Sequence, residues 1–202
     1  MARAPRAFAF RHELARKALH ILTVAAPLAY AGGLPRRVLI LLLVAASVIV
    51  VALEVVRARH ATTRAIFQRT VGALLRPHEH ERWAGATWLI LAFLGVVLLA
   101  PREVAITAMW AVSAGDAAAA LVGRGIARAH GDPSRKTFAG SAACFVVTLG
   151  GALLVAQLLP VEGVIAAAAA TAAERPQGGL DDNFRIVTAV ALALVTWRMA
   201  FP

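Results

Sequence analysis

The sequence predicts an all-α membrane protein, a polytopic bundle of about seven transmembrane helices. Of its 202 residues 60% are hydrophobic and 16% are charged, and the mean hydropathy is +0.72. A soluble domain is about half apolar and about a quarter charged. The apolar residues also form long blocks instead of the short periods of a water-soluble core. The composition therefore argues against a soluble enzyme, a disordered chain and a fibrous protein, and the length predicts one domain over 1–202.

Seven blocks approach the roughly 20 apolar residues that a helix needs to cross a bilayer. They are Ala18–Leu34, Val38–Val56, Ala84–Ala100, Val104–Gly123, Phe138–Leu159, Val161–Ala173 and Arg185–Phe201. Prolines separate several of them, as expected of helix breakers. The sixth block is short, so a re-entrant segment or a helix shielded by its neighbours is an alternative to a full span. Its run Ala166–Ala170 predicts a closely packed helix face, because small residues let membrane helices approach.

The basic residues predict a cytoplasmic N-terminus and a multi-pass protein of the inner (cytoplasmic) membrane. Lys and Arg are enriched on the cytoplasmic side, and only four of the 21 fall on the other side: Arg36, Arg37, Arg102 and Arg198. Anionic headgroups or a polyphosphate substrate explain the net charge of +10. Nucleic acid is not expected as a partner, because no basic groove with interleaved aromatic residues is found. A cleaved signal peptide is the alternative interpretation of the first block.

Residues 57–83 form the predicted cytoplasmic segment between the second and third blocks. Arg64–Arg76 has the pattern of a basic amphipathic helix lying on the bilayer, and a cytosolic loop helix is the alternative. His78 and His80 flank Glu79, but adjacent helical residues point apart, so a metal site is not predicted there. The single cysteine, Cys144, rules out a disulfide framework and a Cys-based zinc site.

Acidic residues within or beside the blocks mark the candidate site, because charges in a bilayer are costly and tend to be functional. Asp116 lies roughly 10 Å inside the fourth block at 1.5 Å per residue. It has no basic residue within a helical turn, so a functional role is favoured. Glu54, by contrast, lies three residues before Arg57, which favours a structural ion pair. The other acids of this half are Glu174, Asp181 and Asp182, with Asn183 beside them.

Carboxylate and amide oxygens suit Mg²⁺, and basic residues on the same side suit phosphates. This is the electrostatic arrangement of phosphoryl transfer. Arg124 lies between Gly123 and Gly125, where backbone amides can approach a phosphate, although glycines also simply end helices. Thr137 is predicted to cap the fifth helix. Lys136 either reaches a phosphate at that helix N-terminus or anchors the span at the interface.

The N-terminal segment places four polar residues on one face of a helix that enters the membrane. These are Glu13, Arg16, Lys17 and His20, at the spacing i, i+3, i+4 and i+7. His20 carries this polar face into the bilayer. It can serve as a general base, as a phosphate ligand or as a hydrogen-bonded structural histidine.

Taken together, these segments resemble the membrane family of dolichol kinases, phytol kinases and CTP-dependent diacylglycerol kinases. The matching pieces occur in the family's order: Glu13 to His20; Glu54 with Arg57; Arg76 to Glu79, then Gly85-Ala86-Thr87; Gly115-Asp116 to Gly123-Arg124; Lys136-Thr137 with Gly140-Ser141; and Glu174, then Asp181-Asp182-Asn183. Each piece is short, so the ordered set carries the resemblance. The family's usual Lys-Ser is Lys136-Thr137 here, and the proline often found soon after the Asp-Asn pair is missing.

The resemblance implies transfer of the γ-phosphate of CTP to the hydroxyl of a polyprenol, a phytol-like alcohol or diacylglycerol. It assigns Mg²⁺ to Asp116 and to the segment from Asp181 to Asn183. The residues that it assigns to phosphate binding are Arg124, Lys136, Thr137, Gly140, Ser141, Lys17 and His20. Lys136 and Glu174 are also assigned to catalysis. The residues that it assigns to substrate binding or support are Glu13, Arg16, Glu54 and Glu79. Asp116 and Glu174 are alternatives for the general base, and the oligomeric state is left open.

Three other functions are alternatives. A phosphatidate cytidylyltransferase also uses CTP, but its usual C-terminal run, with His-Gly-Gly and an Asp-Arg pair, is not found. A small proton- or cation-coupled transporter would need access from both faces. A purely structural membrane subunit would leave the acids of the cytoplasmic half unexplained.

Overall fold

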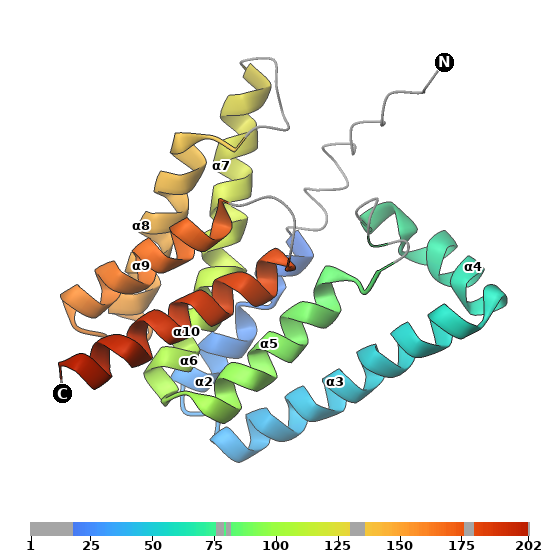
Figure 1. The fold of residues 1–202 in the computed structure, drawn as a ribbon, viewed down its shortest axis with the longest axis horizontal. Helices are drawn as coiled ribbons and strands as arrows, with labels where there is room; N and C mark the ends of the chain where they lie inside the picture. The colour runs from blue at the N-terminus through green and yellow to red at the C-terminus, as the bar shows by residue number, and fades with distance from the viewer. Residues whose placement is uncertain (1–17, 76–78, 80–81, 130–135, 176–179, 202) are drawn as a thin grey trace.

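The computed structural model describes residues 18–75, 79, 82–129, 136–175 and 180–201 (Figure 1). Within these residues the regular structure is helical and no strand occurs, which confirms the predicted all-α class. Residues 18–22 are helical and lead through a turn into the first helix with a label. The α-helices are α2 (Ala25–Ala31), α3 (Arg36–Arg59), α4 (Ala61–Thr70), α5 (Gly85–Leu99), α6 (Arg102–Trp110), α7 (Asp116–Ala129), α8 (Phe138–Leu154), α9 (Pro160–Glu174) and α10 (Asp182–Ala200).

The helices pack in an order that differs from their order in the chain. α3 packs against α5, α5 against α10, α10 against α9, α9 against α8, and α8 against α7 (Figure 1). α6 lies against both α10 and α2. Val104, Met109 and Val112, on α6 and the turn after it, are fully buried, as are Ile186 and Val190 of α10. The core therefore lies where α6 and α10 cross.

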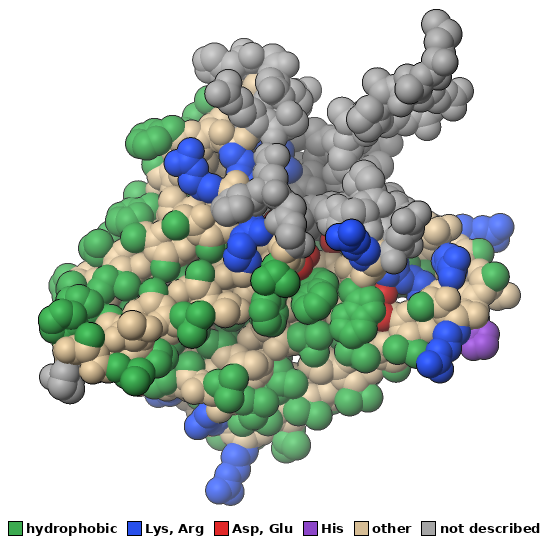
Figure 2. All heavy atoms as spheres, in the orientation of Figure 1, with side chains coloured by type: hydrophobic (Ala, Val, Ile, Leu, Met, Phe, Trp, Pro, Cys, Tyr) green, Lys and Arg blue, Asp and Glu red, His purple; other side chains and the backbone are tan. Residues whose placement is uncertain are grey.

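Three helical stretches among the described residues are long and apolar enough to cross a membrane: Arg36–Arg59, Arg102–Ala127 and Asp182–Ala200. Shorter apolar helices are Ala18–Ala31, Gly85–Leu99 and Phe138–Leu154. Figure 2 shows hydrophobic side chains spread over the face in view, between areas of backbone and other side chains. The apolar helices agree with a membrane protein, and the count of seven spans stays a prediction.

Two predicted blocks were too long as single helices. The fifth was expected to run to Leu159, but α8 ends at Leu154. Gln157 has a positive φ of 57°, so the chain turns there before Pro160 begins α9. The first block was expected over Ala18–Leu34, but a turn at Thr23 and Val24 divides it and α2 ends at Ala31.

One local prediction is confirmed, and a second is met only in part, because α4 is helical but ends at Thr70 instead of Arg76. Ala166, Ala167 and Ala170 of α9 are fully buried, and α9 packs against α8 and α10. Small side chains thus bring three helices together, as expected. α4 covers the first part of the predicted amphipathic segment, and none of its residues is buried. Its Phe67 ring lies 4.8 Å from the guanidinium of Arg57, which holds α4 against the end of α3.

Three of the four arginines assigned to the side away from the N-terminus tie helix ends together. Arg36 donates to the carbonyls of Val97 and Leu98 near the end of α5. Arg102 donates to the carbonyls of Tyr30 and Ala31 at the end of α2. Arg198 of α10 pairs with Glu162 of α9 at 2.6 Å. Basic groups at helix C-termini satisfy the last carbonyls, and we call this region, defined by Arg36, Arg102 and Arg198, the arginine end.

Candidate active site

A π-helical turn directly before Asp116 interrupts the central helix. α6 runs into this turn over Ala111–Gly115, and α7 begins at Asp116. The backbone N–H of Asp116 donates to the carbonyl of Ala111, five residues back, where a continuous α-helix would use the carbonyl four residues back. Single π-helical turns inside α-helices are frequent at functional sites. Asp116 is only 5% exposed, so its carboxyl lies inside the bundle.

His20 lies beside Asp116. Its Nε2 atom is 2.7 Å from the carbonyl oxygen of Val112 and 3.8 Å from Oδ2 of Asp116. Thr23 hydrogen-bonds to the hydroxyl of Ser113 at 2.8 Å. The first helical segment therefore directs two polar side chains at the π-helical turn. The other residues of the predicted N-terminal polar face, Glu13, Arg16 and Lys17, lie outside the described residues.

Lys136 and Glu174 form a second group. Lys136 lies just before α8, and Glu174 is the last residue of α9. The Lys136 ammonium lies 2.7 Å from Oε1 of Glu174 and also donates to the backbone carbonyl of that residue. The Glu174 side chain is buried and the Lys136 side chain is 31% exposed. Two residues that the sequence assigned separately to the reaction thus meet directly.

Thr137 caps α8, as predicted. Its hydroxyl accepts a hydrogen bond from the backbone N–H of Gly140 at 3.1 Å. A Cβ on Gly140 would lie 2.8 Å from the carbonyl oxygen of Ala119 and 3.1 Å from Cα of Gly123. Gly123 and Gly140 therefore let α7 and α8 pack closely. Gly123 lies inside α7, which continues to Ala129, so the alternative that this glycine ends a helix is wrong.

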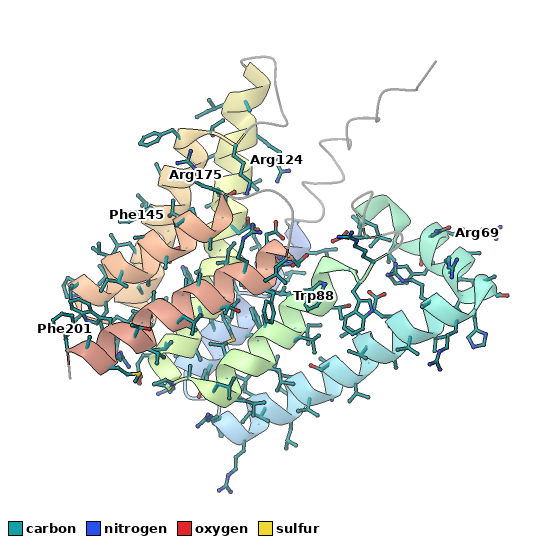
Figure 3. The ribbon with its side chains drawn as sticks, viewed as in Figure 1. Arg69, Trp88, Arg124, Phe145, Arg175 and Phe201 are labelled. Atoms are coloured by element: carbon teal, nitrogen blue, oxygen red, sulfur yellow. The ribbon has the colours of Figure 1, made fainter. Side chains whose placement is uncertain are left out.

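Three further predicted residues lie near the same helix ends. Ser141 is buried in the first turn of α8. Arg124 is half-buried on α7, and its Nε donates to the carbonyl of Ala120. Arg124 and Arg175 lie at the same end of the bundle (Figure 3). Asp182 is the first residue of α10 and is half-buried.

Glu54 and Arg57 form the predicted ion pair, which is buried. Glu54 Oε1 also accepts hydrogen bonds from the backbone N–H of Ala84 at 2.8 Å and from the hydroxyl of Thr87 at 3.2 Å. Arg57 donates in addition to the backbone carbonyls of Glu79 and Arg82. The first N–H groups of a helix have no partner within the helix. The pair therefore supplies a remote cap for α5.

Gly85 is the centre of a third group. Its N–H donates to Oε1 of Glu79 at 2.9 Å, and its carbonyl accepts from Nδ2 of Asn183 at 2.9 Å. Asp181 caps α10 by accepting from the N–H of Asn183. A Cβ on Gly85 would lie 2.9 Å from the Glu79 carboxylate and 3.4 Å from that of Asp181. A larger residue at position 85 would displace the Glu79 carboxylate from its hydrogen bond with this backbone N–H, which gives a reason for the glycine of the Gly85-Ala86-Thr87 segment.

Aromatic side chains lie beside this third group. The rings of Trp83 and Trp88 have centroids 5.7 Å apart, and Trp88 meets Phe184 of α10 edge to face at 5.8 Å. Figure 3 shows Trp88 between the ribbons of α5 and α10. Tryptophan is enriched where a membrane meets water. No local pattern distinguishes these residues, because the contact between Trp88 and Phe184 joins two distant segments.

Among the residues that the structure describes, no three His, Cys, Asp or Glu side chains are close enough to hold a metal ion by themselves. A metal held jointly by one or two carboxylates and by substrate phosphates is compatible with this arrangement.

Comparison with known proteins identifies the chain's relatives. CTP-dependent diacylglycerol kinase 1 of Saccharomyces cerevisiae is 30% identical over 142 residues, 69% of this chain and 49% of the relative. The protein of the same name from Eremothecium gossypii is also 30% identical over 142 residues, 45% of its length. The chain is therefore similar to two proteins named as CTP-dependent diacylglycerol kinases. This confirms the resemblance that the ordered motifs indicated.

The similarity covers only part of each relative. The chain spans about half the length of the two curated kinases. No family model matches it, and no solved structure matches it. The roles of individual residues therefore rest on the geometry described above.

Proposed function

We propose that the protein is a CTP-dependent lipid-alcohol kinase that transfers the γ-phosphate of CTP to the hydroxyl of a membrane lipid. The observation that carries this proposal is the similarity to two proteins named as CTP-dependent diacylglycerol kinases. Their names make diacylglycerol the first acceptor to test, with polyprenol and a phytol-like alcohol as the others. The buried acids beside basic residues support a phosphoryl transfer site.

The proposed topology has seven spans, a cytoplasmic N-terminus and an active site at the cytoplasmic face. The distribution of Lys and Arg supports this orientation. Glu174, Asp181 and Gly85 all lie at helix ends, near the predicted membrane surface. Trp83 and Trp88 lie beside Gly85, as aromatic residues at headgroup depth would. The lipid hydroxyl can then approach laterally from the bilayer while CTP arrives from water.

Mg²⁺ is the proposed cofactor, and carboxylate and amide oxygens are the ligand types that it prefers. Mg²⁺ is usually held by one or two carboxylates together with substrate phosphates, and it keeps several waters. Asp116, Asp182 and the Oδ1 atom of Asn183 are the proposed protein ligands. Asp181 is already engaged as the α10 cap. When bound, Mg²⁺ neutralises negative charge on the nucleotide phosphates.

Lys136 and Arg124 are proposed to bind the phosphates. An ammonium group has three N–H donors, and Lys136 uses two directions toward Glu174. Its remaining donor can bind the transferred phosphoryl group, with Ser141 and Thr137 helping to position the phosphate. The lipid oxygen forms a bond to the γ-phosphorus as the bond from phosphorus to the β–γ bridging oxygen breaks and CDP leaves. Glu174 or Asp116 accepts the hydroxyl proton.

The test is phosphate transfer by the purified protein in detergent with Mg²⁺. Label from γ-labelled CTP, but not from ATP, should appear in an organic-soluble product with diacylglycerol, polyprenol or phytol. The acceptor that is labelled names the substrate. No lipid labelling, with pyrophosphate released from CTP and phosphatidate, would contradict the proposal and indicate a cytidylyltransferase.

A further inference from the structure

The hydrogen bond from His20 to Val112 replaces a bond that the π-helical turn has removed. In a continuous α-helix the carbonyl of Val112 would accept from the N–H of Asp116, four residues on. That N–H instead donates to Ala111. The Val112 carbonyl accepts from Nε2 of His20 at 2.7 Å, from another helix. His20 therefore gives the Val112 carbonyl a donor from another helix, in place of the Asp116 N–H.

The chemistry of the acceptor determines the state of the Nε2 atom. A carbonyl oxygen has lone pairs and no hydrogen, so Nε2 must carry the proton of this bond. An Nε2 atom that already carries a hydrogen cannot accept a proton from a substrate hydroxyl. The same atom lies 3.8 Å from Oδ2 of Asp116. Its N–H edge thus faces both the Val112 carbonyl and the carboxylate.

The π-helical turn also decides where Asp116 points. Successive residues of an α-helix are about 100° apart around the axis, so one extra residue in the turn rotates α7 by about that angle relative to α6. Without this extra residue Asp116 would face a different neighbour. Ser113 and Thr23 make a second hydrogen bond between the turn and the first helical segment.

We infer that His20 is a positioning residue: its Nε2–H stabilises the π-helical turn through the Val112 carbonyl and thereby places the Asp116 carboxylate. The inference deepens the proposed function, since it depends on Asp116 acting in phosphoryl transfer. It assigns His20 neither proton transfer nor phosphate binding.

Two amide variants test the inference with a matched control. The side-chain nitrogen of glutamine can replace Nε2 of histidine, whereas that of asparagine reaches only the Nδ1 position. His20→Gln should keep kcat within about threefold of wild type. His20→Asn and His20→Ala should lower kcat by about tenfold to a hundredfold, the usual cost of losing a group that orients a ligand. The KM for CTP should change less than twofold in all three variants.

Each other result overturns the inference. Equal loss in His20→Gln and His20→Ala would show that the imidazole itself is needed, as for a base. A tenfold rise in the KM for CTP at unchanged kcat would indicate a phosphate ligand. Full activity in all three variants would show that His20 positions nothing. An inactive wild-type protein would instead contradict the proposed function, so the two failures are distinguishable.

Two further measurements need no activity. In protein that is isotope-labelled at histidine nitrogens, the NMR resonance that disappears in His20→Gln belongs to His20. That resonance should show a protonated Nε2 atom, and an unprotonated Nε2 would overturn the inference.

Deleting Ala114, a half-buried residue of the π-helical turn, should give the Val112 carbonyl a backbone donor. His20→Ala should then lower the melting temperature of the wild-type protein but not that of the deletion variant. An equal loss in both would contradict the role of the turn.

Discussion

The two ends of the bundle use charge in opposite ways. At the arginine end, the guanidinium groups of Arg36 and Arg102 donate to carbonyls at helix ends, and Arg198 pairs with Glu162 between α9 and α10. At the other end, which we call the acid end, the charged groups include the buried carboxylates of Asp116, Glu174, Glu54 and Glu79. Some of these acids hold helices together and others are the proposed chemical groups. Burial alone therefore does not separate the acids that hold helices together from those that are proposed for chemistry.

The hydrogen-bond partners of Glu54 and the neighbours of Asp116 differ. Glu54 accepts from Arg57, Ala84 and Thr87, and this set of donors accounts for a carboxylate that caps a helix. Asp116 lies beside His20 and directly follows the π-helical turn. Variants at both ends can therefore test which charges serve stability and which serve turnover.

The largest effect on turnover is expected for Asp116→Asn. Removing the carboxylate charge should lower kcat by about a thousandfold, since groups that stabilise charge in a transition state are each worth about a hundredfold to a thousandfold. The melting temperature in detergent should change little, because asparagine has a similar size. Glu103→Gln at the arginine end is the matched control, since the Glu103 side chain is 46% exposed. Normal turnover by Asp116→Asn would remove Asp116 from the site.

A large loss of stability is expected for Arg57→Met. This change leaves the Glu54 carboxylate buried without its cation, and breaking a buried ion pair costs about 3–5 kcal/mol. Chemical unfolding in mixed micelles should show the loss. The double variant Arg57→Met with Glu54→Gln should recover part of it, because the uncompensated charge is gone. If the two changes added independently, the pair would not be a coupled structural unit.

A moderate loss of stability is expected for Gly151→Ala, on α8. An added Cβ would lie 2.1 Å from the indole of Trp110, whose Nε1 donates to the Val147 carbonyl. Overpacking of this kind costs about 1–3 kcal/mol. Gly150→Ala is the matched control, since a Cβ there meets nothing within 4 Å. Thermal unfolding of the two variants should differ, and equal melting temperatures would show that α8 and α6 are not packed as described.

The smallest effect is expected for Arg36→Gln. The side chain makes two hydrogen bonds to the last turn of α5 at a partly exposed site. Its loss should cost about 1 kcal/mol, the usual net value of such bonds. Activity per folded molecule should equal that of wild type. A drop in kcat would show that the arginine end influences the reaction and would break the comparison.

Much of this architecture was predictable from local sequence. Apolar blocks marked helices α3, α5, α8, α9 and α10, because a segment that crosses lipid must satisfy its backbone internally. The Thr137 cap and the pair of Glu54 with Arg57 were also predictable, since each involves residues three apart in sequence. The ordered motifs further indicated the family.

The contacts between distant segments were not predictable. Gly85 meets Asn183 across 98 residues, and Lys136 meets Glu174 across 38. No period or local motif encodes these distances. The break in the first block at Thr23 and Val24 and the end of α8 at Leu154 were likewise missed, because hydropathy does not distinguish a helical residue from an apolar turn residue.

The sequence by itself determined that the protein is an apolar helical chain, with buried acids and with the motifs of a CTP-dependent lipid kinase. Those properties follow from side-chain chemistry and from spacing along one helix. Only the tertiary structure decided which acids accept hydrogen bonds from the backbone of other segments, because those partners are distant in the chain. The π-helical turn before Asp116 is the clearest case, because its stability depends on a donor supplied by His20, 92 residues from Val112 in the chain.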